Sequence, residues 1–266
     1  MDILKTHDLT RKFGDLTAVD HMNISLRQGE FFGLLGPNGA GKTTAIKMLI
    51  TLLPPTSGTA TVAGHDIVTA QRDVRRHIGY VPQLLSADGQ LTGYENLLVF
   101  ARLFDVPRGE IRQRVEDALD FMGLKGAGDT LVRKYSGGMI RRLEIAQSML
   151  HRPQLLFLDE PTLGLDPIAR RTVWEHLARL RKDFNATILM TTHYMDEADK
   201  LCDRLAIMHL GSVVAMGTPA ELKAGIGNEN ATLDEVFTHY SGGTLEEAQG
   251  GYRETRMTRR TAGRLR

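Results

Sequence analysis

The stretch Gly36-Pro37-Asn38-Gly39-Ala40-Gly41-Lys42-Thr43-Thr44 fits the phosphate-binding pattern G-x-x-x-x-G-K-S/T at every fixed position. Its glycines let several backbone N–H groups point at one anion, and a following helix adds partial positive charge at its N-terminus. Lys42 can reach the β- and γ-phosphates, and the Thr43 hydroxyl can ligate Mg²⁺. Residues 30–35 before the loop predict a buried strand, and Ala45–Leu53 after it predict a helix that ends before two prolines. This context predicts a binding site for a nucleoside triphosphate.

The composition argues against several classes of protein. The chain has 266 residues with 33 Lys and Arg against 32 Asp and Glu, so its net charge does not favour nucleic acid or a membrane surface. The single cysteine, Cys202, allows no internal disulfide and indicates a reducing compartment; we interpret it as a small core residue. Residues 1–6 lack the pattern of a secretory signal, and no apolar run approaches the roughly 18 residues of a spanning helix. If the protein acts at a membrane, we expect a separate chain to span it.

The N-terminal residues 1–30 predict antiparallel strands, among them His21–Arg27, where apolar and polar residues alternate. Phe13 stands at a predicted turn, and two interpretations of it stay open: a hydrophobic plug, or a face on which an adenine ring stacks. Further along, Thr59–Ala63 and Ile78–Val81 predict short strands. Gln83 follows the second of these, and by itself a solvated loop residue is its simplest interpretation.

Residues 84–150 change character and predict a helical insertion. Thr92 and Glu95 have the spacing of a capping box, and Ile111–Met122 carries apolar residues on one face of a helix. The insertion ends in Tyr135-Ser136-Gly137-Gly138-Met139 before another helix. Ser136 can cap this helix, and the N–H groups of Gly137 and Gly138 favour an anion in front of it, although a plain cap would explain the same residues.

A second buried strand, over residues 154–159, ends in two carboxylates. A parallel strand delivers its C-terminal residues to the ligand crevice, so Asp159 can hold Mg²⁺ through water together with Thr43. Glu160 can orient or deprotonate an attacking water. Without the phosphate loop, the two acids would equally explain a helix cap.

The remaining chain predicts helix Pro167–Phe184, strand Ala186–Met190 and a hairpin of residues 205–208 and 212–216. We expect the helix to turn Ile168, Val173, Trp174, Leu177 and Leu180 inward. The strand leads to His193, a candidate sensor of the γ-phosphate that would more often be structural if it stood alone.

Taken in order, these motifs resemble the nucleotide-binding subunit of ATP-binding cassette (ABC) transporters over roughly residues 1–225. The resemblance makes Phe13 the adenine-stacking aromatic and Gly36–Thr44 the Walker A loop. It makes Gln83 the Q-loop residue, which in the family senses Mg²⁺ and meets the transmembrane partner. The other correspondences are Tyr135–Met139 to the signature motif, Leu155–Asp159 to Walker B, Glu160 to the catalytic glutamate, Leu165-Asp166 to the D-loop and His193 to the switch histidine.

Three positions depart from the family pattern. Phe13 stands where tyrosine is usual, which keeps the ring and loses a hydroxyl. Tyr135 and Met139 stand where leucine and glutamine are usual. Ser136 and both following glycines are present, so the part of the signature motif that faces phosphate is intact.

The resemblance implies an α/β fold with a P-loop NTPase core, built from a mostly parallel sheet with flanking helices. An N-terminal antiparallel β subdomain and a helical insertion would complete it. The ABC domain would span residues 1–225, with the core in 1–83 and 151–225 and the helical subdomain in 84–150. Residues 226–266 would form a C-terminal extension with a basic tail.

The resemblance also implies ATP hydrolysis with ATP and Mg²⁺ as cofactors. Two copies would meet head to tail, so that ATP on one Walker A loop is covered by the signature motif of the other copy. A separate transmembrane permease would be the partner, the site of action would be the cytoplasmic face of the cell membrane, and no nucleic acid would be bound. The implied catalytic residues are Glu160, His193 and Gln83; the implied metal ligands are Thr43, Gln83 and Asp159; and the implied nucleotide contacts are Phe13, Gly36, Pro37, Asn38, Gly39, Ala40, Gly41, Lys42, Thr43, Thr44, Ser136, Gly137, Gly138 and Asp166.

Within the family, the run from Glu160 to Pro167, the signature motif, the segment Thr232–Phe237 and the arginine-rich end resemble bacterial drug-resistance export ATPases of the daunorubicin type. This implies export of a drug-like or hydrophobic compound. The alternatives that stay open are an importer ATPase, a non-transport ABC ATPase acting on ribosomes or DNA, and a plain P-loop kinase, which would not need the signature motif. The basic end, with Arg253, Arg256, Arg260 and Arg264 at helical spacing, is either a solvated tail or a contact with anionic lipid or an acidic partner.

Overall fold

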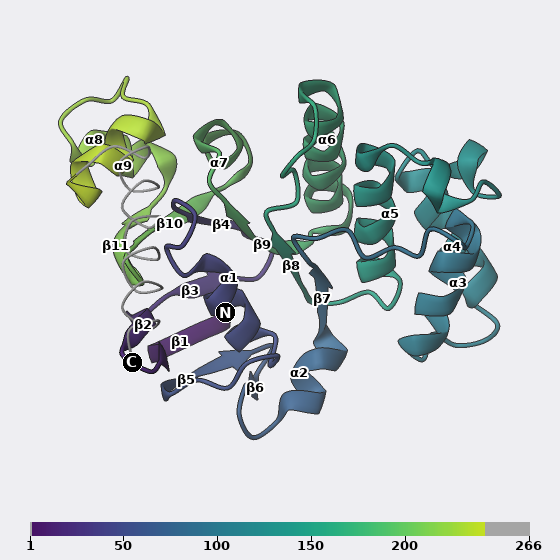
Figure 1. Ribbon diagram of the computed structural model, residues 1–266, viewed down its shortest axis with the longest axis horizontal. Coiled ribbons are helices and arrows are strands. Elements are labelled where there is room, and N and C mark those ends of the chain that lie inside the picture. Colours follow the sequence, from purple (N-terminus) through teal and green to yellow (C-terminus); the bar gives the residue numbers. More distant parts are fainter. Residues whose placement is uncertain (1, 243–266) are drawn as a thin grey trace, which may run out of the picture.

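The computed structural model describes residues 2–242, and Figure 1 shows how their elements are arranged. The arginines of the predicted basic tail lie outside the described residues. The strands are β1 Asp2–Phe13, β2 Leu16–Met22, β3 Ser25–Arg27, β4 Phe31–Leu35, β5 Ser57–Val62, β6 His65–Asp66, β7 Ile78–Val81, β8 Leu155–Asp159, β9 Thr187–Thr192, β10 Arg204–His209 and β11 Ser212–Gly217. The α-helices are α1 Lys42–Leu49, α2 Gln71–His77, α3 Gly93–Leu103, α4 Ile111–Phe121, α5 Gly137–Met149, α6 Pro167–Phe184, α7 Met195–Leu201, α8 Pro219–Gly225 and α9 Leu233–Ser241, with short 3₁₀ turns at Lys125–Ala127 and Val132–Lys134.

Two sheets build the α/β core. The first has strand order β2-β1-β5-β6, with β3 also paired to β1, and all of its pairings are antiparallel. The second has order β11-β10-β4-β9-β8-β7 and is parallel except for the terminal hairpin β10–β11. The predicted fold class, a mostly parallel sheet with an antiparallel β subdomain at the N-terminus, is confirmed.

The central strands of the parallel sheet are buried on both faces, which explains their continuous apolar sequences. In β4, Phe31 and Leu35 pack into one hydrophobic cluster with α5, α6 and α9, whereas Phe32 and Leu34 pack into a second cluster. The second cluster lies between the two sheets and contains the inner face of α1. Burial on both sides makes β4 a rigid support for the loop that follows it.

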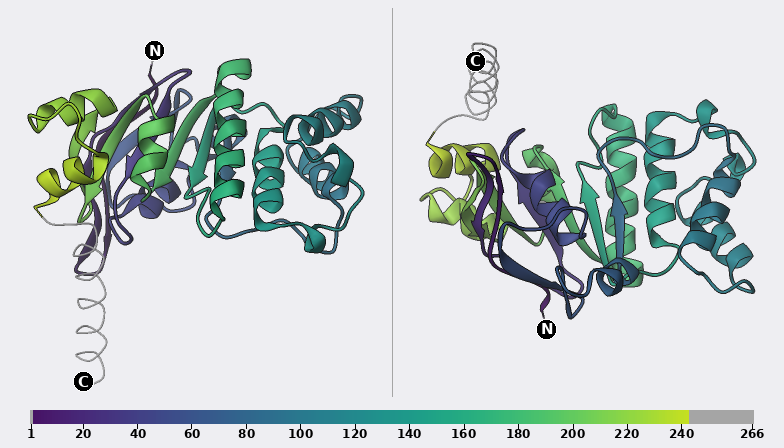
Figure 2. Two further views of the ribbon diagram at one scale, coloured as in Figure 1. Left: turned by 90° about the horizontal axis from the view of Figure 1, so that it is seen from above. Right: turned by 60° about the horizontal axis from the view of Figure 1, so that its bottom comes forward.

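Residues 84–150 form the helical region, which contains α3, α4 and α5 and no strand of either sheet. Thr92 caps α3 with the predicted capping box: its hydroxyl accepts from Glu95 N, and Glu95 Oε2 accepts from Thr92 N. Helix α5 packs against α3 and α4 on one side and against α6 and β7 on the other. Figures 1 and 2 show the helical region and the pair α8–α9 at opposite ends of the molecule, with the sheets between them.

Three local expectations are wrong. His21–Arg27 is not one strand, because His21 has a φ of 43° and Asn23 bonds instead to Asp8, so β2 ends at Met22 and β3 begins at Ser25. Met22, Ile24 and Leu26 are nevertheless buried in alternation. The alternation of apolar residues therefore predicted which side chains are buried, but not that the strand is interrupted.

Helix α1 ends at Leu49, not at residue 53, because Thr51 adopts a left-handed φ of 65° before the prolines are reached. Ile168 does not face inward: it is 81% exposed in the first turn of α6, whereas Val173, Trp174, Leu177 and Leu180 are buried as expected. Periodicity alone does not report whether a residue on the apolar face of a helix has a packing partner.

The C-terminal part of the described chain packs onto the core. Val236 and Phe237 of α9 are fully buried, and α9 contacts α7, α8 and β11. Cys202 is also buried, and burial raises the pKa of its thiol well above the ordinary value, as a core residue requires. Among residues 2–242 no helix is long and apolar enough to cross a membrane.

Candidate functional site

The phosphate loop runs from the end of β4 to the start of α1. At each end of the loop, a backbone carbonyl from another segment approaches so closely that only glycine fits. A Cβ on Gly36 would lie 2.3 Å from the Met208 carbonyl oxygen, and one on Gly41 would lie 2.2 Å from that of Ala18. Gly41 also has a φ of 106°. Pro37 and Ala40 are buried, Asn38 and Gly39 are exposed, and Thr44 is half-buried. The loop is therefore anchored at both ends, with its middle open to a ligand.

Lys42 is almost fully buried at the centre of this loop. Its ammonium donates to the carbonyl oxygens of Gly36 at 2.7 Å and Pro37 at 3.0 Å, and lies 3.1 Å from Glu160 Oε1. Burial lowers the pKa of Lys42, while the carboxylates of Glu160 and Asp159 oppose this shift. The geometry thus holds one cation inside the anion-binding loop.

Asp159 is positioned by strand pairing. It lies opposite Thr191 in the β8–β9 register, and Thr191 Oγ1 donates to Asp159 Oδ1 at 2.7 Å. Thr43 Oγ1 donates to the same oxygen at 3.1 Å. Burial raises the pKa of Asp159, and the two hydroxyl donors oppose this. Thr191 is a site residue that was not predicted from the sequence; its place near the end of the predicted strand that leads to His193 was the available signal.

Glu160 receives three side chains at its carboxylate. Lys42 pairs with Oε1, His193 Nδ1 lies 3.1 Å from Oε2, and Gln83 Nε2 donates a longer hydrogen bond of 3.4 Å to Oε2. Burial alone would raise the pKa of Glu160, but the partners His193 and Lys42 bring it below its ordinary value. Glu160 also has a φ of 48°, and its N–H donates to Thr191 Oγ1 at 3.0 Å. The three predicted catalytic residues therefore meet at one buried carboxylate.

The donor set beside the phosphate loop matches a hard cation. Thr43 and Asp159 offer oxygen ligands, and Mg²⁺ is commonly held by one or two carboxylates together with waters and substrate phosphates. No cluster of three His, Cys, Asp or Glu side chains among residues 2–242 could hold a metal unaided. The residues present fit an ion that arrives with a nucleotide.

Phe13 lies at the tip of the β1–β2 hairpin, whose second strand contacts the phosphate loop through Ala18. Its ring is 46% exposed and lies beneath the Arg11 guanidinium, 4.6 Å from the ring centroid. It is therefore not buried as a hydrophobic plug would be. An exposed ring on the hairpin that contacts the loop fits the stacking interpretation.

The signature residues stand at the start of α5, apart from the phosphate loop. Ser136 is the exposed N-cap, with its hydroxyl accepting from Met139 N at 3.3 Å. Tyr135, the first departure in this motif, is buried and donates its hydroxyl to the Ala127 carbonyl at 2.7 Å. Leucine at position 135 would fill the same core without that hydrogen bond.

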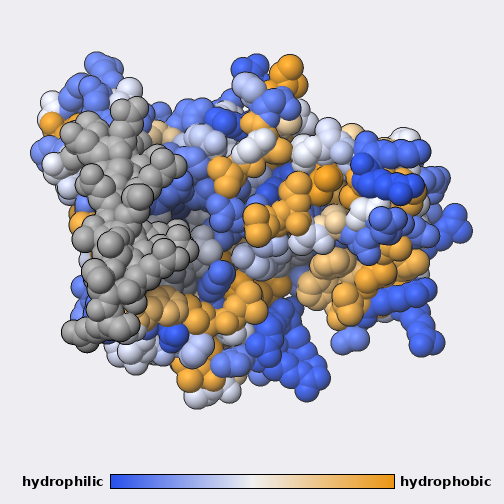
Figure 3. Space-filling model, viewed as in Figure 1, coloured by the Kyte–Doolittle hydropathy of each residue, from blue (hydrophilic) through white to orange (hydrophobic). Residues whose placement is uncertain are grey.

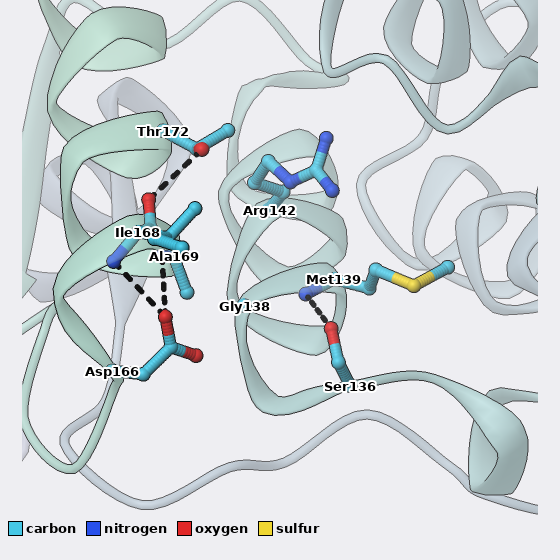
Figure 4. A pocket seen from close by; sticks show the side chains of 8 residues that line it. All are labelled: Ser136, Gly138, Met139, Arg142, Asp166, Ile168, Ala169 and Thr172. Carbon is cyan, nitrogen blue, oxygen red and sulfur yellow. Dashed lines mark hydrogen bonds between the residues drawn. The ribbon is translucent and has the colours of Figure 1, made fainter.

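Asp166 lies across a hollow from the signature residues. It caps α6 by accepting from the N–H groups of Ile168 at 3.0 Å and Ala169 at 2.9 Å. Figure 4 shows Ser136 and Asp166 on the two sides of this hollow, which has a volume of about 290 Å³. A Cβ on Gly138 would lie 2.8 Å from Ala169 Cβ, so glycine permits the close approach of α5 and α6.

The predicted site residues thus fall into two groups. One surrounds the phosphate loop and contains Glu160, Gln83 and His193; the other contains Ser136–Gly138 and Asp166. Within residues 2–242 no hydrogen bond or ion pair joins the signature residues to the phosphate loop.

A protein-family model described as ABC transporter matches residues 19–163, which contain both the phosphate loop and the signature residues. The chain belongs to the ABC transporter family. Membership makes this ABC ATPase an ATP-binding, ATP-hydrolysing subunit, which excludes the plain kinase. ABC ATPase subunits generally dimerise and pair with a membrane permease.

The ABC ATPase has close relatives among known proteins. It is 46% identical over 225 residues to the daunorubicin/doxorubicin resistance ATP-binding protein DrrA of Streptomyces peucetius, covering 85% of this chain and 68% of the relative. It is 44% identical over 220 residues to the Nod factor export ATP-binding protein I of Ralstonia nicotianae, covering 83% and 68%. A solved structure of an ATP-binding subunit of an ABC transporter superposes with a TM-score of 0.80 at 30% identity, covering 90% of this chain and 99% of that one.

Proposed function

We propose that this ABC ATPase drives a separate membrane permease that exports a drug-like or hydrophobic compound. The observation that carries the proposal is the division of the site: Glu160 and its partners lie at the phosphate loop, while Ser136–Gly138 start α5 elsewhere, with no hydrogen bond or ion pair to that loop among residues 2–242. The N-terminus of a helix favours an anion. In the proposal, this anion is the nucleotide bound to the phosphate loop of a second copy of the chain.

The working unit in this proposal is a head-to-tail homodimer. ATP bound at Lys42 of one copy meets Ser136 and Gly138 of the other. Asp166, beside the hollow at α5, then lies at the dimer interface. Hydrolysis removes the bridging γ-phosphate and lets the dimer open.

Within each site, the residues take the roles that their geometry supports. Thr43 and Asp159 would hold Mg²⁺, with Gln83 near enough to sense it, and Mg²⁺ would neutralise charge on the phosphates. Glu160 orients or deprotonates the attacking water, and its lowered pKa keeps it ionised as a base. His193, 3.1 Å from Glu160, contacts the γ-phosphate.

The permease is proposed to dock beside the Q-loop. Leu84 is 81% exposed directly after Gln83, and Leu103 of α3 is 70% exposed, with Leu85 and Val99 also exposed. Figure 3 shows hydrophobic side chains gathered over the helical end of the molecule between charged ones. Exposed apolar residues on the segment that carries Gln83 support a contact through which a permease senses the nucleotide. This contact would hold the subunit at the cytoplasmic face of the membrane.

Export, rather than import, is supported by the relatives, which are named as a daunorubicin/doxorubicin resistance protein and a Nod factor export protein. The test is a pull-down of the tagged Glu160→Gln chain from its native membranes with Mg-ATP, followed by mass identification of its partners. A polytopic membrane protein is expected. An accompanying extracytoplasmic binding protein would favour import, and a ribosomal or DNA-bound partner without a membrane protein would overturn the transport role.

The arginine-rich end supports a second, smaller hypothesis, contact with anionic lipid headgroups. Truncation after Tyr252 is expected to weaken binding to vesicles that contain an anionic lipid. Unchanged binding would leave the tail as a solvated segment.

A further inference from the structure

Two opposite charges lie buried on α5, one helical turn apart. Arg141 Nη1 is 3.0 Å from Glu144 Oε2, and the side chains are 1% and 2% exposed. Burying an ion pair costs desolvation energy, and well-packed apolar residues of similar volume often serve stability equally well. The pair therefore calls for an explanation other than stability.

Both side chains hold the same segment of main chain. Arg141 donates from Nη1 to the Pro82 carbonyl at 2.6 Å and from Nη2 to the Gln83 carbonyl at 2.8 Å. Glu144 Oε1 accepts from the N–H and hydroxyl of Ser86 and from the N–H of Ala87 at 3.3 Å. The planar guanidinium suits two acceptors at once, and the carboxylate suits several donors. We call Arg141 and Glu144 the α5 clamp.

The clamped segment has few other attachments. Leu84 and Leu85, which lie between the clamped residues, are 81% and 49% exposed, so their side chains do not anchor it. The segment nevertheless carries Gln83, whose amide reaches Glu160. The clamp is thus what fixes Gln83 relative to α5.

Ser136, the N-cap of α5, lies five residues before Arg141, so the clamp and the signature residues share one rigid element. We infer that Arg141 and Glu144 are positioning residues: they hold the Q-loop and the signature helix together as one body and so place the Gln83 amide at Glu160. The inference rests on the proposed catalytic role of Gln83.

The test replaces both charges with apolar residues of similar size, Arg141→Met with Glu144→Met, because this change removes the clamp without leaving an unpaired buried charge. ATPase activity of the full chain is then measured with and without Gln83→Ala. We expect kcat to fall about tenfold with the KM for ATP changed less than about twofold, and we expect little further loss when Gln83 is already alanine, because coupled residues are non-additive.

A general folding defect would lower kcat by the same factor in both backgrounds, and that result would overturn the inference. An unchanged kcat in the clamp variant would overturn it too. If Gln83→Ala alone leaves turnover unchanged, the proposed role of Gln83 fails first, and the clamp inference fails with it. Arg114→Met is the matched control: Arg114 donates to the Leu150 carbonyl at 2.7 Å and pairs with Glu110, so it also braces α5 but does not touch residues 82–87.

Discussion

The ammonium of Lys42 lies 3.1 Å from a carboxylate oxygen of Glu160, and the two side chains are 4% and 5% exposed. The cation of the phosphate loop and the proposed base are therefore each other's partner in this structure. We expect a nucleotide phosphate at the loop to compete with Glu160 for Lys42 and to free the carboxylate to face the attacking water. Binding and chemistry would then be linked through one ion pair.

Glu160→Gln is expected to lower ATP hydrolysis by roughly 10²–10⁴-fold, the usual contribution of a positioned base. ATP affinity is expected to be kept or increased, because Lys42 no longer faces a competing carboxylate. Phosphate release and equilibrium nucleotide binding measure the two effects. Glu175→Gln, on the exposed face of α6, is the control, and near-wild-type turnover of Glu160→Gln would reject the base role.

Lys42→Ala is expected to weaken ATP binding by at least about 10–100-fold, since hydrogen bonds from a charged donor contribute about 1.5–3 kcal/mol each. Equilibrium binding of a fluorescent ATP analogue measures the change. Lys47→Ala on the same helix removes an exposed charge and should bind normally. Unchanged affinity in Lys42→Ala would count against the loop assignment.

Phe13→Ala is expected to weaken ATP binding about tenfold, because stacking of one base on an aromatic ring contributes about 1–3 kcal/mol. Phe13→Tyr keeps the ring and should bind as the wild type does. Leu16→Ala is the matched control, since Leu16 pairs with Phe13 across the turn and is 48% exposed. If the Phe13→Ala and Leu16→Ala variants bind ATP with equal affinity, Phe13 does not stack on the adenine ring and its role is structural.

Ser136→Asp is expected to prevent dimers from forming with Mg-ATP while leaving ATP binding by the single chain intact. Aspartate keeps the N-cap of α5 but places a negative charge toward the phosphates of the other copy. Sedimentation of the Glu160→Gln chain, with and without Ser136→Asp, measures the dimer. Ser136→Thr keeps both the cap and the neutral hydroxyl and serves as the control. Dimers that survive Ser136→Asp would contradict the head-to-tail arrangement.

Glu197→Gln tests a buried carboxyl outside the site. Glu197 Oε1 accepts from Trp174 Nε1 at 2.7 Å and from Thr162 Oγ1 at 2.9 Å, which ties α7 to the segment that follows Glu160. Burial raises the pKa of Glu197 above its ordinary value of 4.5, although these donors oppose the shift. The folded protein then retains a proton that the unfolded chain releases, so this carboxyl costs stability as pH rises from 4.5 through its folded pKa.

Glutamine resembles the protonated form and should relieve that cost. The unfolding free energy of Glu197→Gln, relative to wild type, is therefore expected to increase from about pH 4.5 upward and then level off, as measured by denaturant titration at several pH values. A constant difference across this range would show that Glu197 is ionised equally in both states. Glu175→Gln on the exposed face of α6 is the control for removing a carboxylate elsewhere on the protein.

Much of the fold was predictable because its signals are local. The phosphate loop, the capping box at Thr92 and the bounds of α6 at Pro167 and Phe184 depend on neighbours within a few residues. Each family motif is likewise a short run of residues, and the order of these motifs along the chain predicted the family. Two predictions were wrong: the continuous strand across His21 and the inward position of Ile168. Both were based on the spacing of apolar residues, which indicates the face that a residue prefers but not whether another element packs against it.

By itself, the sequence determined which residues form the phosphate-binding pattern and which carry carboxylates, since glycine spacing and residue chemistry reside in the chain. Only the tertiary structure decided how these residues meet. The β8–β9 register places the Thr191 hydroxyl within hydrogen-bonding distance of Asp159. The packing of α5 against the sheet places the Arg141 guanidinium at the main-chain carbonyl of Gln83. Lys42 and Glu160 are far apart in sequence, and their contact depends on β4 and β8 both being neighbours of β9 in one sheet. Local propensity carries no information about such neighbours, because they are selected by the burial of both faces of that sheet.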